Sequence, residues 1–187
     1  MDNKKKRKGT LIIIDMQNDF ITGSLANPAA QAIVDPIVDL IGHWAGNVVA
    51  TRDTHAYNYL TTLEGKKLPI EHCLMNTSGW CIEDRIMRAL YERGNHIIDK
   101  RNSFAPNWGT NSCGDCLLDD VFIVGTCTDI CVISSALVIK SAYPDKNVAV
   151  FEDLCAGTTP ERHKAAIEVM KSCQIDILTC GPEEKPE

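Results

Sequence analysis

The chain has 187 residues, of which 44% are hydrophobic and 24% are charged. This balance can bury a sizeable core, and it excludes a disordered chain and a disulfide-stabilised miniprotein. The formal net charge is −6, and residues 1–8 contribute +4 to it, so the rest of the chain carries −10. An acidic body is a poor partner for phosphate backbones, so we expect no nucleic-acid partner.

We expect a single domain over residues 9–180, flanked by a basic disordered tail at 1–8 and a short polar tail at 181–187. No apolar run of signal-peptide length begins the chain. The longest apolar stretch, 121–139, is interrupted by Asp129 and has the pattern of a strand, a turn and a helix. These features predict a cytoplasmic protein with no membrane partner, and its nine cysteines are therefore expected as reduced thiols.

The first elements alternate between strand and helix patterns. Residues 10–14 form an apolar run that predicts a fully buried strand ending at Asp15. Residues 29–44 have the spacing of an amphipathic helix, which Pro36 starts or kinks. A second short strand is expected at 48–50.

The middle of the chain has a weaker pattern. Residues 54–79 show no strong period and are interpreted as a long functional loop. A helix is expected over 82–90, closed by Gly94, and a strand over 96–98.

The second half repeats the alternation. Strands at 121–124, 148–151 and 175–178 alternate with helices at 129–142 and from Pro160 through Met170. This order predicts an α/β fold of three layers, α/β/α, around a central parallel sheet of about six strands. In such sheets ligands bind outside the carboxyl ends of the strands.

Three reactive side chains follow strand ends. Asp15 and Lys100 each come directly after a predicted strand, and Cys131 lies in the first turn of the helix after the break at Gly125. Each has an ordinary structural explanation alone: a turn-forming carboxylate, a solvated lysine and a packed thiol. A thiol at a helix N-terminus, however, is expected to have a lowered pKa that favours the nucleophilic thiolate.

Together these side chains suggest a reaction. The ammonium would lower the thiol pKa further, and the carboxylate would accept the thiol proton and later give it to a leaving group. The thiol would attack a carbonyl while backbone N–H groups of the turn hold the oxyanion. This pattern is typical of amide hydrolysis through a thioester.

A second constellation offers metal ligands. Asp53 and His55 form an Asp-x-His pair at a strand end, and His72 follows in the same long loop. Mixed carboxylate and imidazole ligands suit zinc, manganese or iron. Glu64 is either a fourth ligand or an ordinary exposed carboxylate.

These segments carry a resemblance to a known family. The chain resembles the isochorismatase-like cysteine hydrolases, and within them the nicotinamidase/pyrazinamidase branch. The matching segments, which span residues 10 to about 155 in family order, are Leu11-Ile-Ile-Ile-Asp-Met-Gln-Asn-Asp-Phe20, Thr51-Arg-Asp-Thr-His55, Leu68-Pro-Ile-Glu-His-Cys73, Asp99-Lys-Arg101 and Val124-Gly-Thr-Cys-Thr-Asp-Ile-Cys-Val132.

The resemblance implies a catalytic triad of Asp15, Lys100 and Cys131. It also implies a cis peptide bond between Thr126 and Cys127, with the N–H groups of Cys127 and Cys131 forming the oxyanion hole. Cys127 departs from the family, which usually has alanine there. A second thiol beside the nucleophile allows a Cys127–Cys131 disulfide if the geometry permits.

The same resemblance assigns one divalent metal ion, with zinc preferred over iron or manganese, to Asp53, His55 and His72. Glu64 aligns with a ligand of some members. In family nicotinamidases the metal binds the pyridine nitrogen of the substrate. Isochorismatases and several carbamoyl or ureido amidases share the triad but generally lack this ligand set, so its presence favours nicotinamidase.

Aromatic residues line the substrate ring in nicotinamidases. Phe20 matches one of them, and Phe104 or Trp108 would supply the other wall. The alternative for each of the three is a core position, which is the commoner fate of an isolated aromatic. The resemblance also implies a homo-oligomer, a dimer or a tetramer. The paired Cys113 and Cys116 have no second half of a zinc site and are interpreted as incidental thiols.

Three functions are therefore weighed. The first is nicotinamidase, which converts nicotinamide to nicotinate and ammonia. The second is a related cysteine hydrolase acting on another small amide, carbamoyl or ureido compound. The third is a non-catalytic metal-binding module with an unreactive Cys131.

Overall fold

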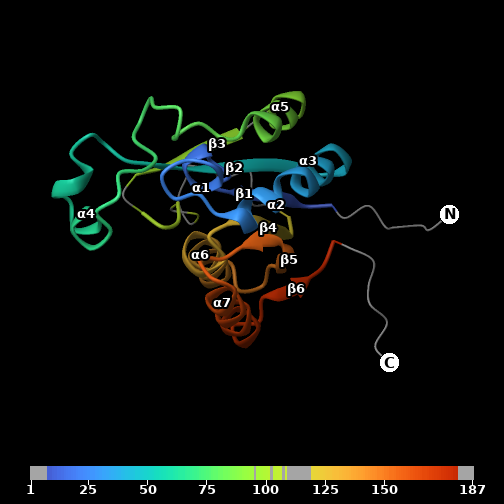
Figure 1. The fold of residues 1–187 in the computed structure, drawn as a ribbon. Coiled ribbons are helices and arrows are strands. Elements are labelled where there is room, and N and C mark those ends of the chain that lie inside the picture. The colour runs from blue at the N-terminus through green and yellow to red at the C-terminus, as the bar shows by residue number, and fades with distance from the viewer. Residues whose placement is uncertain (1–7, 95, 102, 107, 109–118, 181–187) are drawn as a thin grey trace.

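A sheet of six parallel strands forms the centre of the structure (Figure 1). The computed structural model describes residues 8–94, 96–101, 103–106, 108 and 119–180. The strands are β1 (Thr10–Ile14), β2 (Asn47–Thr54), β3 (His96–Arg101), β4 (Val121–Thr126), β5 (Val148–Ala156) and β6 (Asp176–Leu178). Their order across the sheet is β3-β2-β1-β4-β5-β6, and the predicted parallel sheet of about six strands is confirmed.

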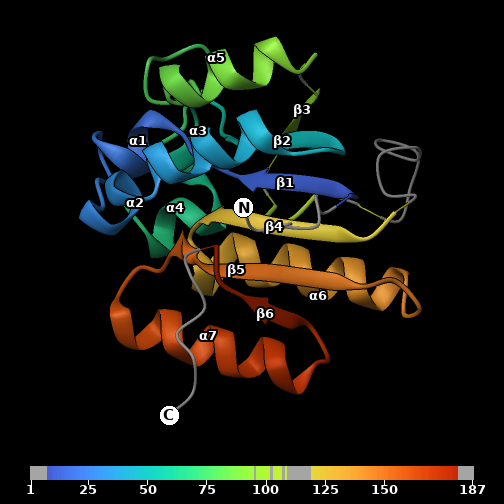
Figure 2. The same cartoon turned by 90° about the vertical axis from the view of Figure 1, so that its right-hand side faces the viewer.

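Helices cover both faces of the sheet, as the views in Figures 1 and 2 show. On β1, Leu11 and Ile13 belong to a buried cluster with Ile37, whereas Ile12 and Ile14 belong to a second cluster on the other face. This alternation follows from the two-residue period of a strand and confirms the three-layer α/β/α fold. The longer helices are α3 (Val34–His43) and α5 (Asp84–Glu92) on the first face and α6 (Ile133–Ala142) and α7 (Pro160–Ser172) on the second.

The strand order reverses its direction between β1 and β4. The chain builds β1, β2 and β3 outward toward one edge, and then returns to place β4 on the other side of β1. In open parallel sheets the crevice at such a reversal is where ligands bind. The topology therefore predicts a ligand site at the carboxyl ends of β1, β4 and their neighbouring strands.

The helix predicted over 29–44 is two helices, α2 (Pro28–Ala32) and α3, separated at Ile33. A continuous helix would press the ring of Pro36 against the carbonyl of Ala32 and leave that carbonyl without a donor. At the third position of α3, where N–H groups have no partner within the helix, proline is tolerated.

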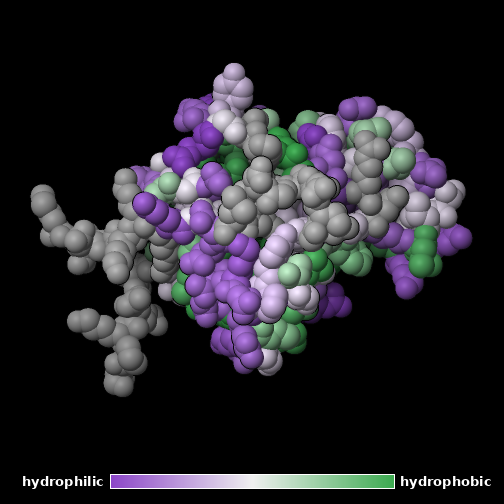
Figure 3. Space-filling model, turned by 180° about the vertical axis from the view of Figure 1, so that it is seen from behind, coloured by the Kyte–Doolittle hydropathy of each residue, from purple (hydrophilic) through white to green (hydrophobic). Residues whose placement is uncertain are grey.

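The long functional loop predicted over 54–79 is not irregular throughout. This segment contains the short helices η1 (Tyr59–Thr61) and α4 (Leu63–Lys67), and Thr62 caps α4 by accepting a hydrogen bond from the Gly65 N–H. Helices of three and five residues are too short to show a hydrophobic period. The segment projects from the sheet, and Leu63 on it is 71% exposed; Figure 3 shows hydrophobic side chains among hydrophilic ones in this region.

Several strands extend further than the sequence predicts, and their extra residues matter for the site. β3 continues through Lys100, β4 continues through Gly125 to Thr126, and β2 continues to Thr54. The helix expected from Asp129 begins instead as a π-helical turn, η2 (Thr128–Val132), that leads into α6.

The expected tails lie outside the described residues, apart from Lys8, as do Cys113 and Cys116. The first helix of the fold, α1 (Asn18–Ile21), is a single turn directly after β1. In the described part of the chain, no helix has the length and apolar character that crossing a membrane requires.

Gly125 tests the packing between β1 and β4. Its φ is +120°, and a Cβ there would lie 2.2 Å from the carbonyl oxygen of Ile14. Gly125→Ala is therefore expected to lower the free energy of unfolding by at least about 2 kcal/mol. Gly42 in α3 is the control, since no atom lies within 4 Å of the added Cβ.

Gly42→Ala is expected to raise the free energy of unfolding by about 0.5–1 kcal/mol, because alanine loses less backbone entropy in a helix. Denaturant titrations of both variants measure the difference. An unchanged midpoint for Gly125→Ala would contradict the close approach.

Candidate active site

Asp15, Lys100 and Cys131 meet at the carboxyl edge of the sheet. Lys100 Nζ lies 2.7 Å from Asp15 Oδ2, and it donates a hydrogen bond to Cys131 Sγ at 3.3 Å. All three side chains are buried. The structure thus brings together the three residues that the sequence places at separate element ends.

Asp15 is held in place by its backbone and by β2. Its φ is +47°, in the left-handed region that residues other than glycine rarely adopt. Thr51 Oγ1 donates to Asp15 Oδ1 at 2.6 Å and accepts from the Asp15 N–H at 3.2 Å. The carboxylate therefore has one oxygen on Thr51 and the other on Lys100, both fixed by strands.

Burial and the neighbouring charges together shift the pKa values of these three groups. It raises the pKa of Asp15, an effect that the positive charge of Lys100 only partly offsets. Burial also raises the pKa of the Cys131 thiol well above its ordinary value, and the Asp15 carboxylate adds to this. Burial opposes the charge on Lys100, but the negative charge of Asp15, and that of Cys131 once its thiol is ionised, outweigh it and raise the pKa of Lys100.

The expectation of a lowered Cys131 pKa is therefore wrong for this arrangement. Lys100 lowers the pKa of Cys131, but burial and the adjacent Asp15 carboxylate outweigh this effect. The resting thiol keeps its proton beside Asp15, whose raised pKa makes it a stronger base than an exposed aspartate.

The turn before Cys131 has the expected shape. The peptide bond between Thr126 and Cys127 is cis, and the Cys127 carbonyl accepts from the N–H groups of Ile130 and Val132. Cys127 and Cys131 are free thiols here, and burial raises the pKa of Cys127 to about 11. Cys127 is thus a protonated, half-buried neighbour of the nucleophile candidate.

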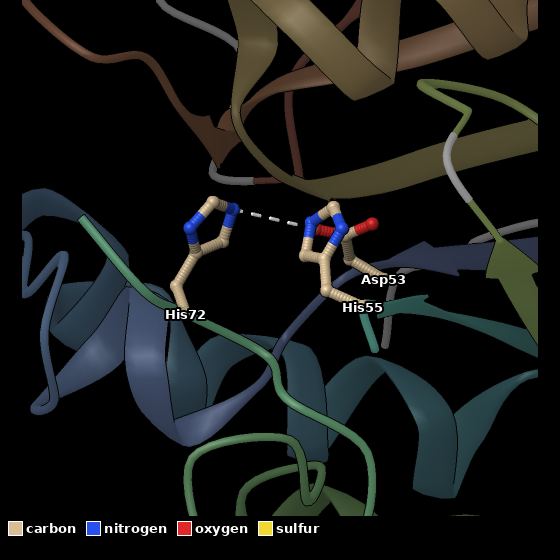
Figure 4. Close-up of side chains that lie close together, drawn as sticks. All are labelled: Asp53, His55 and His72. Carbon is tan, nitrogen blue, oxygen red and sulfur yellow. Dashed lines mark hydrogen bonds and ion pairs between the residues drawn. The ribbon is translucent and has the colours of Figure 1, made fainter. Parts of the chain in front are cut away.

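Asp53, His55 and His72 form a group that can hold a metal ion (Figure 4). All three are buried, and their ligand atoms lie within 4.8 Å of one another. His55 Nε2 lies 2.8 Å and His72 Nε2 3.6 Å from Asp53 Oδ2. Burial opposes ionisation of Asp53, but the His55 hydrogen bond and the Lys100 charge lower its pKa.

The histidine rings are oriented by the protein around them. His72 Nδ1 donates to the Ile70 carbonyl at 2.9 Å, so Nε2 is the nitrogen that carries a lone pair toward Asp53. Tyr59 packs edge-on against both imidazoles, and its hydroxyl donates to the Leu68 carbonyl. This donor set, with its second layer of contacts, fits a divalent ion such as zinc.

Glu64 lies at the margin of this group. Its Oε1 is 3.8 Å from His55 Nε2, and its side chain is 30% exposed, in contrast with the three buried residues. The sequence leaves its role open. Its position on α4 places it close enough to contact the group but does not make it a member of the tight cluster.

Gln17 joins the two constellations, and sequence reasoning missed it. Its side-chain amide donates to the Asp53 carbonyl and accepts from the Asp53 N–H, at 2.9 and 2.7 Å, and it also donates to the Trp80 carbonyl. The signal was available, because Gln17 lies two residues after Asp15 in a matched segment. Thr51, which begins the Asp53 segment, was missed in the same way.

The three aromatic residues have different environments. The Phe20 ring lies 5.7 Å from the His72 ring, next to the Asp-His-His group. Phe104 is 54% exposed and contributes its carbonyl as an acceptor for Lys100. Trp108 is 2% exposed and packs in the cluster with Ile12, so its described contacts are those of a core residue.

Comparisons with known proteins agree with this geometry. The Isochorismatase domain family matches residues 10–180. A nicotinamidase of Schizosaccharomyces pombe is 25% identical over 90% of this chain and 92% of its own length. The structure of a Pyrococcus horikoshii pyrazinamidase in complex with zinc is 26% identical, with a TM-score of 0.74, covering 92% of this chain and 99% of that one.

The fold also serves another substrate class. An N-carbamoylsarcosine amidase of Thermoplasma acidophilum is 23% identical with a TM-score of 0.74, covering 96% of this chain and 100% of that one, and this likeness concerns the fold alone. Because the family match spans nearly the whole described chain, this protein belongs to the isochorismatase domain family.

Proposed function

We propose that this protein is a nicotinamidase, a cysteine amidohydrolase that converts nicotinamide to nicotinate and ammonia. The observation that carries the proposal is the placement of Asp15, Lys100 and Cys131 beside a buried Asp-His-His group at one edge of the sheet. The S. pombe nicotinamidase, similar along nearly its whole length, supports the substrate.

The first half of the reaction uses the thiol and the carboxylate. Cys131 Sγ attacks the carboxamide carbon while Asp15 accepts the thiol proton. The N–H groups of Cys127 and Cys131 hold the oxyanion. Asp15 then gives that proton to the amide nitrogen, the C–N bond breaks, and ammonia leaves a thioester on Cys131.

The second half restores the enzyme. Asp15 accepts a proton from water as the water oxygen attacks the thioester carbon. The C–S bond breaks, the carboxylic acid forms, and the proton passes from Asp15 to Sγ. Lys100 stays protonated throughout, because its pKa is raised, and it stabilises negative charge on both Asp15 and the sulfur.

Asp53, His55 and His72 would hold one divalent ion, with zinc preferred over iron or manganese. The zinc-bound P. horikoshii pyrazinamidase supports this choice. When bound, the ion supplies a Lewis-acidic position for a ring nitrogen. Phe20 lies beside His72, so its ring would contact the pyridine.

The nucleophile is tested by Cys131→Ala. Removal of the sulfur is expected to lower ammonia release from nicotinamide by about 10^4-fold or more, because no covalent intermediate can form. The matched control is Cys173→Ala, which removes an exposed thiol at the end of α7. Equal activity of wild type and Cys131→Ala, with both folded, would refute the proposed role.

The metal ligands are tested by metal content. We expect one equivalent of divalent metal in the wild-type protein. Loss of a residue that only hydrogen-bonds a metal ligand lowers metal affinity roughly 10–100-fold, and we expect His72→Ala, which removes a ligand itself, to lower it by more. Glu64→Ala is the comparison, and its partial exposure predicts a smaller change. Elemental analysis after dialysis against a chelator measures both; full retention by His72→Ala would exclude the site.

A substrate panel separates the two hydrolase functions. If a metal anchors the ring nitrogen, nicotinamide and pyrazinamide are expected to react at least about 10-fold faster, in kcat/KM, than benzamide, which lacks that nitrogen. Faster hydrolysis of carbamoyl or ureido compounds would favour the second function. An unreactive Cys131 toward iodoacetamide, with no turnover of any of these compounds, would favour the non-catalytic module.

The expected dimer or tetramer stays a prediction, which the mass of the purified protein in solution tests.

A further inference from the structure

A buried threonine connects the turn before the nucleophile to α7. Thr128 follows Cys127 directly and is fully buried. Its Oγ1 lies 2.9 Å from Nδ1 of His163, which α7 carries 35 residues further along the chain. His163 itself is half-buried, and neither the triad nor the metal group uses it.

The hydrogen bond has a definite direction. Among the described residues, His163 Nδ1 is the hydrogen-bond partner of the Thr128 hydroxyl, which is buried away from water. A buried hydroxyl proton without an acceptor is costly, so Thr128 donates and Nδ1 accepts. His163 is therefore neutral and carries its proton on Nε2.

Asp129, the residue after Thr128, is bound to Thr158, which lies just before α7. Asp129 Oδ1 accepts from the Thr158 N–H at 2.8 Å, and Oδ2 accepts from the Thr158 hydroxyl at 2.5 Å. Two consecutive residues of η2 are thus bound to this part of the chain, Thr128 to α7 itself and Asp129 to the segment that leads into it. Both contacts hold the start of the turn on which Cys131 lies.

The absence of a side chain at Gly157 leaves room for His163 in the position from which it contacts Thr128. A Cβ at Gly157 would lie 2.7 Å from the Cβ of His163, closer than side chains approach one another. The Gly157 carbonyl also accepts from Asn27 Nδ2 at 2.8 Å, which anchors this point to the loop before α2. The backbone at Gly157 is thus anchored by Asn27 and packs against the base of the His163 side chain.

We propose that His163 is a positioning residue, which in its neutral form holds Thr128 and so sets the alignment of the Cys127 and Cys131 N–H groups and of the Cys131 thiol. The proposal rests on the proposed cysteine-hydrolase function. A displacement of about 1 Å at a reacting group costs about 10²-fold in rate, so a single hydrogen bond at the base of the turn is enough to matter.

The groups that face His163 permit a test by pH. Burial lowers its pKa below the ordinary 6.5, Glu152 on β5 and Asp129 on η2 act in the opposite direction, and Lys164 on α7 lowers it. The charged residues Glu152, Lys164, Glu168 and Lys171 line a surface hollow beside the ring, which gives protons access to it. Protonation turns the Nδ1 acceptor into a donor and removes the partner of the Thr128 hydroxyl.

The experiment compares His163→Ala with His163→Asn, whose Oδ1 is attached to Cγ as Nδ1 is and can accept the same hydrogen bond. We expect His163→Ala to lower kcat for nicotinamide by about 10–100-fold with KM within about 2-fold, and His163→Asn to keep kcat within about 3-fold of wild type. Metal content and circular dichroism verify that each variant is folded and loaded.

Thr128→Val removes the other partner, and the double variant Thr128→Val/His163→Ala completes a cycle. Because one hydrogen bond is lost in all three, the double variant is expected to be no slower than the slower single variant. Additive losses, an unchanged kcat for His163→Ala, or a His163→Asn variant as slow as His163→Ala would each overturn the proposal. If His163→Ala does not fold, Thr128→Val alone decides: a lowered kcat supports the role of His163, and an unchanged kcat refutes it.

Two further measurements distinguish a positioning role of His163 from a purely structural one. The fractional loss of kcat from pH 7.5 to pH 5.5 is expected to be smaller in His163→Asn than in wild type, since asparagine does not titrate. The rate of Cys131 alkylation by iodoacetamide is expected to change in His163→Ala and to recover in His163→Asn. If wild type hydrolyses no amide, the function fails, and this alkylation rate still decides the role of His163.

Discussion

The buried ion pair between Asp15 and Lys100 is the constraint on which the rest of the site depends. Two opposite charges 2.7 Å apart, with no exposed side-chain surface, lose their hydration and are stable only if the protein replaces it. Thr51, the carbonyls of Ser103 and Phe104 and the Cys131 sulfur supply these replacement contacts. The pair therefore fixes β1, β2, β3 and η2 relative to one another, and the thiol receives its polar environment from the same contacts.

Apolar runs in the sequence were enough to predict the parallel sheet, because strands buried on both faces are apolar at nearly every position. Residues 10–14 and 121–124 are examples, and both are strands. The short helices η1 and α4 within residues 54–79 were not predicted. They depend on local capping and on contacts such as that of Gly65 with Tyr59, which have no sequence period. The prediction placed the start or kink of this helix at Pro36, whereas the break lies at Ile33. The reason is that a proline ring clashes with the carbonyl one turn before it.

The candidate site also has features that the sequence predicted and features that it did not. Asp53, His55 and His72 were predicted because ligand chemistry restricts the residue types, and the structure groups them. The raised pKa of Cys131 could not be predicted, since it depends on burial that only the packed fold creates. The partners Gln17 and His163 were missed for a related reason: each acts through a residue some 35 positions away, and a glutamine or histidine alone indicates no partner.

The strand order has a consequence for how the chain is made. β1 lies between β2 and β4, so until residues 121–126 are synthesised, the nascent sheet has β1 as an edge, with Leu11, Ile12, Ile13 and Ile14 along it. An apolar edge strand is a template for pairing with other chains. Protection of that edge during translation therefore depends on the arrival of β4, the strand that also leads to Cys131. The chain thus covers this apolar edge in the same step that brings the proposed nucleophile to Asp15.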